Sequence, residues 1–319
     1  ALDAGLIDAV ENGGVVEDIL AEHFGSDTDR KIDALDYLRR LPAGPRGDGS
    51  VAVIPVVGAL VYGRGGAGAA GSDDIVSVIE AARSTPGVEA VLLRIDSPGG
   101  DVRAGEAIRR TVQETKTEWD MPVVASMGNL AASGGYWIAL ESDLIVTRPE
   151  TITGSIGVYS LSVTFEEALS RWLGIRVDGY GTTPWSGSGH PGRPLDARMA
   201  SIYAQNIKDI DSMFQSLVAE NRGLDADAVA KLAGGIPWSG RQAFDSGLAD
   251  RIGGLKEAGA YAAEMAGLSE WELRYFDTPI DPREAFLSRL LWGQIRSRRA
   301  GGIRWRTSSP LHFRRNSNP

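Results

Sequence analysis

A serine followed directly by two glycines, Ser133-Gly134-Gly135, is the part of this sequence best suited to chemistry. An apolar run at residues 122–127 predicts a strand before it, and a helix is expected to begin at Gly134. The first N–H groups of a helix have no partners within that helix and favour negative charge. The sequence therefore predicts that Ser133 is a nucleophile at a corner where an oxyanion can be stabilised.

A second glycine turn, at residues 97–101, follows an apolar run that predicts a buried strand at residues 91–96. Acyl transfer needs two hydrogen-bond donors that converge on the carbonyl oxygen. The backbone N–H groups of Gly100 and Gly134 are the predicted pair. The alternative is that both segments are ordinary connections between a strand and a helix, in which glycine permits close packing.

Three segments make the sequence similar to a known family, the signal peptide peptidase A serine proteases: residues 93–100, 127–137 and 153–158. The resemblance implies an α/β fold, namely a Clp protease/crotonase-like spiral of parallel strands with covering helices. It also implies that Ser133 is the nucleophile, and that Ser155 is a serine that helps to orient the catalytic base. The alternative role for Ser155 is to hydrogen-bond within its own turn.

The catalytic base is the point at which the sequence departs from this family. The family uses a serine–lysine dyad, in which burial keeps the lysine neutral. No lysine lies between Ser133 and Lys208, and the stretch where one is expected, residues 178–187, is polar and rich in glycine. Lys208 falls in a long helical pattern, where a solvated surface lysine is the expected role. The dyad is therefore predicted to be incomplete within this chain.

An internal repeat suggests where the lysine lies. Residues 1–8 resemble residues 243–250, and a Gly-Gly pair follows both, at Gly13-Gly14 and Gly253-Gly254. Long members of the family are tandem duplications whose amino-terminal copy supplies the lysine. We therefore expect residues 1–40 to be the end of a truncated first repeat, with the base upstream of Ala1.

A histidine base is the competing mechanism, because a Ser–His–Asp arrangement is recognised by geometry and not by chain order. His190 lies in a glycine- and proline-rich loop near the position where the lysine is expected, and the other histidines are His23 and His312. A histidine in such a loop is usually solvated. Asp96 could orient a histidine base, but a turn-forming role before Pro98 is the more ordinary one.

The composition is that of a soluble enzyme with one main domain: 319 residues, 43% of them hydrophobic. A net charge of −9 argues against nucleic acid as a partner, because phosphate binding relies on a basic face. The chain has no cysteine, which excludes thiol catalysis and disulfides. No cofactor and no metal are predicted. Lysine is scarce, five residues against 28 arginines, so few candidates for the base exist.

The order of predicted elements supports an α/β fold, because strands and helices alternate. A linker at residues 41–49 precedes the serine-bearing domain, residues 50–279, and the glycine-rich residues 63–71 are expected to form a mobile loop. Strands are predicted at residues 51–57, 90–95, 123–127, 144–147 and 175–178, and helices at residues 73–84, 104–118, 165–173 and 196–221 and from Gly134 onward. Both glycine turns then fall at the carboxyl ends of strands, where such folds place their sites.

The pattern of residues 280–319 predicts a basic amphipathic helix, suited to an anionic membrane surface or a neighbouring subunit, and an arginine-rich tail whose last fifteen or so residues are expected to be disordered. By resemblance, the expected function is a serine endopeptidase that cleaves remnant signal peptides at or in the membrane. Its expected partners are signal peptides, other hydrophobic peptides and further copies of the chain. The expected location is the periplasmic or extracytoplasmic face of the inner membrane, with this fragment itself soluble. Two alternatives remain: a crotonase-like acyl-CoA enzyme, which needs no serine at position 133, and a non-catalytic scaffold domain.

Overall fold

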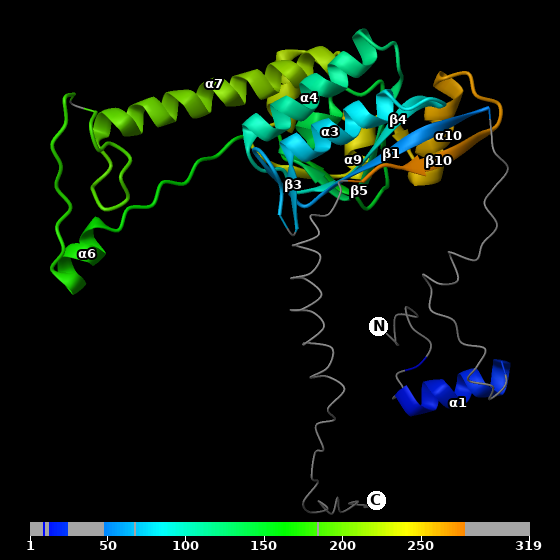
Figure 1. Ribbon diagram of the computed structural model, residues 1–319, viewed down its shortest axis with the longest axis horizontal. Coiled ribbons are helices and arrows are strands. Elements are labelled where there is room, and N and C mark those ends of the chain that lie inside the picture. Colours follow the sequence, from blue (N-terminus) through cyan, green and yellow to red (C-terminus); the bar gives the residue numbers. More distant parts are fainter. Residues whose placement is uncertain (1–8, 10–12, 25–47, 67, 184, 278–319) are drawn as a thin grey trace, which may run out of the picture. The chain divides into compact units, whose positions relative to one another are not determined.

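The computed structural model describes residues 9, 13–24, 48–66, 68–183 and 185–277 (Figure 1). It divides the chain into two units, Ala1–Arg46 and Gly47–Pro319. The first unit contains helix α1, Gly13–Phe24. The predictions for residues 1–8, for most of the linker and for the tail at 280–319 lie outside the described residues.

A mostly parallel sheet forms the centre of the second unit and confirms the α/β class. Six of its strands follow one another in the order β10-β1-β4-β5-β6-β9, and each neighbouring pair is parallel. Their bounds are β1 Gly49–Val57, β4 Val88–Ser97, β5 Val123–Ala132, β6 Leu144–Thr147, β9 Arg251–Ile252 and β10 Trp271–Tyr275. Strand β7, Ile152–Gly154, pairs in parallel with the end of β5, and β8, Pro237–Ser239, pairs with β7 in an antiparallel arrangement.

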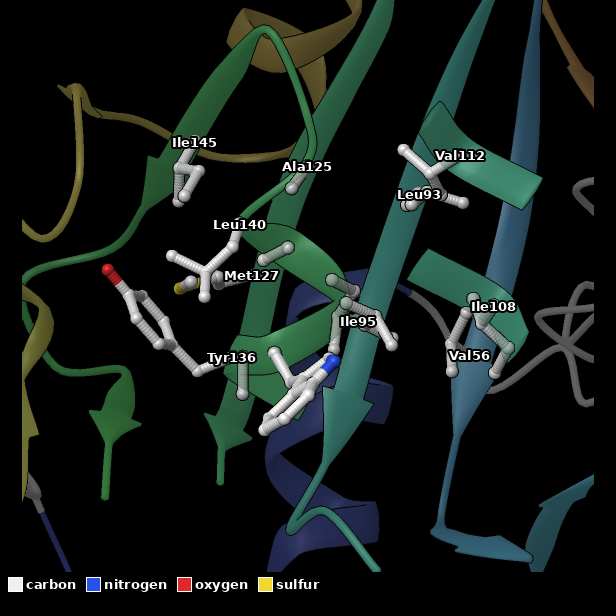
Figure 2. Close-up of a cluster of buried hydrophobic side chains, with 14 of the residues drawn as sticks. Val56, Leu93, Ile95, Ile108, Val112, Ala125, Met127, Tyr136, Leu140 and Ile145 are labelled. Carbon is white, nitrogen blue, oxygen red and sulfur yellow. The ribbon is translucent and has the colours of Figure 1, made fainter. Parts of the chain in front are cut away.

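Helices cover both faces of this sheet, which explains why β1 and β4 are almost continuously apolar. On one face, Leu93 and Ile95 of β4 pack with Ile108 of α4 and Tyr136 of α5 (Figure 2). On the other face, Leu92 packs in the cluster to which α10 contributes. The helices are α3 Ser72–Arg83, α4 Val102–Thr117, α5 Gly134–Ala139, α6 Glu166–Leu173, α7 Ala197–Arg222, α8 Ala226–Leu232, α9 Gly240–Asp245 and α10 Leu255–Met265.

Two predictions about local structure need correction. Residues 175–178 are not a strand: they pair with no strand in the described part of the chain, and Ile175 is half exposed. An apolar run becomes a strand only when a neighbour satisfies its backbone groups. The glycine-rich residues 63–71 are only partly a loop, because β3, Ala69–Gly71, pairs in parallel with β2, Ala59–Val61.

Few residues of the connection between β7 and α7 are buried. We call residues 158–196 the arm; it contains α6, which has no buried residue. No described residue from 159 to 191 is buried, although several of them are large and apolar. Within the part of the chain that the structure describes, no helix is both long enough and apolar enough to cross a membrane.

Candidate active site

Ser133 connects β5 to α5 in a backbone conformation that non-glycine residues rarely adopt, with φ 52° and ψ −119°. Such strain costs about 1–3 kcal/mol and persists only where surrounding contacts impose it. Here the Ser133 N–H donates to the Gly154 carbonyl at 2.8 Å, and the Ser133 carbonyl accepts from the N–H groups of Tyr136 and Trp137, both at 2.9 Å. These contacts hold Ser133 at the strand-to-helix corner that the sequence predicted.

The second glycine turn is held by β2. The Leu60 N–H donates to the Gly99 carbonyl, and the Asp101 N–H donates to the Leu60 carbonyl, both at 2.9 Å. These two bonds bracket Gly100 and leave its own N–H outside the pairing. The Asp101 carboxylate then accepts from the Arg103 N–H at 2.8 Å, which caps the start of α4. The turn is therefore anchored on both sides of Gly100.

The two glycine turns approach each other so closely that side chains would not fit between them. A Cβ atom on Gly99 would lie 2.5 Å from the Gly134 nitrogen and 2.9 Å from the Ser133 Cβ. A Cβ on Gly134 would lie 3.2 Å from the Gly100 nitrogen. Within the described ranges, neither the Gly100 N–H nor the Gly134 N–H donates a hydrogen bond. Two unpaired amides thus lie beside Ser133, which is the arrangement that an oxyanion hole needs.

A cleft of about 940 Å³ brings the four predicted site residues together, because Ser133, Gly100, Gly134 and Ser155 all line it. Ser155 also has a positive φ, 50°. Its hydroxyl donates to the Gly235 carbonyl at 3.3 Å. The bond therefore goes to a distant loop and not to its own turn. The cleft is lined by Ala59, Pro98, Gly99, Gly100, Val102, Gly105, Ser133, Gly134, Trp137, Ser155, Gly157, Val158, Tyr159, Ile207, Lys208, Asp211, Phe214, Gly234 and Gly235.

Sequence reasoning missed the face of α7 that lines this cleft. Ile207, Lys208, Asp211 and Phe214 follow the spacing of one helical face, which is the signal that could have identified them. Lys208 was expected to be a solvated surface residue; it is exposed, but it also lines the cleft that contains Ser133. Asp211 accepts a hydrogen bond from the Gln215 side chain at 2.7 Å.

Trp137 is a second residue that sequence reasoning missed as part of the site. Its ring packs against Phe214 with centroids 4.7 Å apart, and its indole N–H donates to Glu106 at 3.1 Å. Burial by itself would raise the pKa of the Glu106 carboxyl, but hydrogen bonds from Arg109, Arg110 and Trp137 outweigh it and lower the pKa to about 2. The carboxylate stays charged at neutral pH and holds the indole in place.

The structure brings neither residue of the histidine alternative to the cleft. His190 is exposed, and its Nδ1 accepts from the Gly192 N–H at 3.0 Å within its own loop. Asp96 accepts from the Leu130 N–H at 3.2 Å and so joins β4 to β5. Among the described residues, no group of histidine, cysteine, aspartate and glutamate side chains could hold a metal ion. The site defines a class: a serine at a strained turn beside two unpaired amides, as in acyl-transfer enzymes.

Comparisons with known proteins agree with this class. The sequence model of the family described as peptidase family S49 matches residues 115–269. A curated relative named Protease 4 from Salmonella typhi is 38% identical over 280 residues, which is 86% of this chain and 44% of the relative. A putative protease, slr0021, from a Synechocystis strain is 36% identical over 194 residues, which is 61% of this chain and 69% of the relative.

The chain therefore belongs to peptidase family S49, and the resemblance to the signal peptide peptidase A proteases is confirmed, since two further relatives carry the SppA name. The chain spans less than half the length of several curated relatives, including Protease 4. A solved structure of a ClpP1 mutant from Listeria monocytogenes aligns with 65% of this chain and 93% of its own, with a TM-score of 0.44 and 16% identity.

Proposed function

We propose that this chain is the serine-bearing part of a serine endopeptidase and that Ser133 attacks the carbonyl carbon of a peptide bond. The observation that carries the proposal is the meeting of a strained serine with two unpaired amides in one cleft. As the Ser133 oxygen bonds to the carbonyl carbon, its proton passes to a base and negative charge develops on the carbonyl oxygen. The N–H groups of Gly100 and Gly134 bind that charge.

In the remaining steps the proton returns from the base and both products are released. Collapse of the tetrahedral intermediate breaks the carbon–nitrogen bond, and the leaving amine takes the proton back from the base. Water then attacks the acyl-enzyme while the same base removes its proton. The bond between the carbonyl carbon and the Ser133 oxygen breaks, and the base returns the proton to Ser133 as the acid product leaves. The Ser155 hydroxyl, in the same cleft, is the proposed group that orients the base.

The base is proposed to be a lysine from residues upstream of Ala1. Relatives such as Protease 4 are more than twice as long as the matched region, which leaves room for such a segment. Lys208 is the one described lysine that lines the cleft, but it is exposed. We therefore propose that Lys208 is not the base.

Labelling with a fluorophosphonate tests this proposal, because the reagent requires an activated serine. Three proteins are compared: the chain as given, its Lys208→Ala variant, and a form extended upstream by its native sequence. We expect labelling at Ser133 to be at least 100-fold faster in the extended form, with Lys208→Ala within about twofold of its parent. Loss of labelling on Lys208→Ala would instead identify Lys208 as the base. Absence of labelling in every form would favour the acyl-CoA or scaffold alternatives.

The proposed substrates are hydrophobic peptides, including remnant signal peptides, cleaved at or in the membrane on the extracytoplasmic face. The cleft supports an apolar substrate, because Trp137, Phe214, Val102 and Ile207 line it together with glycines. Cleavage of detergent-solubilised signal peptides, compared with charged peptides of equal length, measures this preference. Equal rates on both sets would contradict it.

The arm supports assembly with further copies of the chain. Nine of its large apolar side chains are exposed, and α6 alone has too few residues to be stable in water. The arm leaves the sheet at the cleft wall, since Val158 and Tyr159 line the cleft. A second copy packed on the arm would therefore lie next to the site. The nine residues are Tyr159, Leu161, Val163, Phe165, Trp172, Leu173, Ile175, Tyr180 and Trp185.

Substitution of Trp172 by glutamate is expected to lower the molar mass measured by light scattering from an oligomer to a single chain. Trp172 is 82% exposed, so a charge there costs the isolated fold nothing but disfavours an apolar interface. The control is Trp119→Glu, which changes an exposed tryptophan outside the arm. If both variants keep the parent's mass, or if the parent is monomeric at high micromolar concentration, the arm is not an assembly surface.

A further inference from the structure

Gly105 lies in the interior of α4 without a packing reason. It is buried, and a glycine inside a helix costs about 1 kcal/mol relative to alanine. A Cβ atom at this position would meet the Trp137 Cδ1 at 3.8 Å, and the Gly134 carbonyl oxygen and the Leu60 Cδ1 at 3.9 Å each. These are ordinary van der Waals separations. Alanine would therefore fit the fold, and what the glycine preserves is free space in the cleft that it lines.

The free space lies directly beside the proposed oxyanion hole and has apolar walls. The N–H of Gly134 is one of the two donors. The carbonyl oxygen of the same residue is among the nearest atoms to the position that a Cβ on Gly105 would take. The Trp137 ring forms one wall, and Phe214, which also lines the cleft, packs against it at an interplanar angle of 48°. A peptide carbonyl bound by the two amides would bring its own side chain to this space.

The wall formed by Trp137 cannot move aside easily. Glu106 accepts the indole N–H and also two hydrogen bonds from Arg109, at 2.8 and 3.0 Å. Arg109 in turn pairs with Glu141, which follows the end of α5. The network therefore ties α4 to both Trp137 and the far end of α5. Because the wall is fixed, a methyl group added at position 105 would shorten the pocket and not displace the ring.

We propose that Gly105 sets the size of the pocket for the side chain of the residue whose carbonyl carbon Ser133 attacks, and that this pocket takes apolar side chains as large as leucine or phenylalanine. This assignment rests on the proposed function. It makes Gly105 a specificity-determining residue, Trp137 the wall that it faces, and Glu106 the positioning residue of that wall.

The Gly105→Ala variant tests the assignment in the upstream-extended protein, with peptides that differ only in having alanine, leucine or phenylalanine before the cleaved bond. We expect kcat/KM for leucine and phenylalanine to fall at least tenfold, and kcat/KM for alanine to stay within twofold, because one methylene in such a pocket changes rates about 10–200-fold. The melting temperature is expected not to fall, since alanine favours the helix. Gly66→Ala is the control, because a Cβ there meets no atom within 4 Å and Gly66 does not line the cleft.

An equal loss for all three peptides, or no change for any, overturns the assignment. Equilibrium binding of the same peptides to Ser133→Ala chains, with and without Gly105→Ala, separates this failure from failure of the proposed function. If the Ser133→Ala chain binds no peptide, the peptidase proposal falls and the pocket assignment with it. If it binds all three and Gly105→Ala changes none of the affinities, the pocket assignment alone is wrong. Weaker binding of leucine and phenylalanine peptides only, by tenfold or more, supports both.

Discussion

Replacement of Ser133 by alanine is expected to lower kcat/KM on peptide substrates by about 10⁴-fold or more and to abolish fluorophosphonate labelling. The reason is that the substitution removes the only oxygen proposed to bond to the carbonyl carbon, while the Gly100 and Gly134 amides can still bind the substrate. The fold should tolerate the change, because the hydrogen bonds of the corner are made by the Ser133 backbone and by Gly154. Hydrolysis of fluorogenic peptides and thermal unfolding are the measurements.

The matched control is Ser155→Ala. Ser155 has almost the same positive φ as Ser133, 50° against 52°, and lines the same cleft. If Ser155 orients the base, its loss should cost about 10–100-fold, which is far less than the loss of the nucleophile. Parent-like activity in Ser133→Ala, or equal losses in both variants, would contradict the assignment of the nucleophile.

Substitution of Gly99 by alanine is expected to lower kcat/KM by about 10²–10³-fold. The new Cβ would lie 2.5 Å from the Gly134 nitrogen and 2.9 Å from the Ser133 Cβ, so the two turns must move apart. Their separation sets whether the Gly100 and Gly134 amides can reach one oxygen, and loss of one such donor costs about this factor. Peptide hydrolysis and the free energy of unfolding are measured together.

Gly87→Ala separates this collision from simple backbone strain. Gly87 has φ +80° against +92° for Gly99, so both variants carry a strained alanine, but a Cβ on Gly87 meets nothing within 4 Å. Both variants are expected to lose about 1–3 kcal/mol of stability from the strain. Only Gly99→Ala should lower kcat/KM by about 10²–10³-fold. Comparable activity in the two variants would show that the close approach of the turns does not govern the reaction.

Local patterns were sufficient to predict most of the fold. Residues 51–57 and 91–96 are almost continuously apolar because they lie in strands covered on both faces, and β1 and β4 contain them. The corner at Ser133 and the start of α5 at Gly134 were also predicted, since both depend on the order of a strand, a small residue and glycines. The prediction of a strand at residues 175–178 was wrong, because strand formation requires a partner that no local pattern specifies.

The candidate site was predicted less completely than the fold. Ser133, Gly100, Gly134 and Ser155 lie in one cleft as expected, and their catalytic roles stay predictions. Lys208 is exposed in a helix as expected, but its place at the cleft was missed, because a helical pattern shows that one face is apolar but not which other element that face meets. Here the packing of Phe214 against Trp137 brings this face of α7 to the cleft. The role proposed for Gly105 could not be read from the sequence either, since the sequence shows a glycine in a helix but not the space beside it.

By itself, the sequence determined the peptidase family, the α/β class and the serine proposed to react, because these are carried by residue types in a fixed local order. The tertiary structure alone decided that the Gly100 and Gly134 amides are unpaired and adjacent. Their orientation is imposed by the Leu60 backbone on one turn and by the Gly154 carbonyl on the other, and both contacts come from segments distant in the chain. A main-chain amide has the same chemistry at every position, so only its surroundings can make it a binding group.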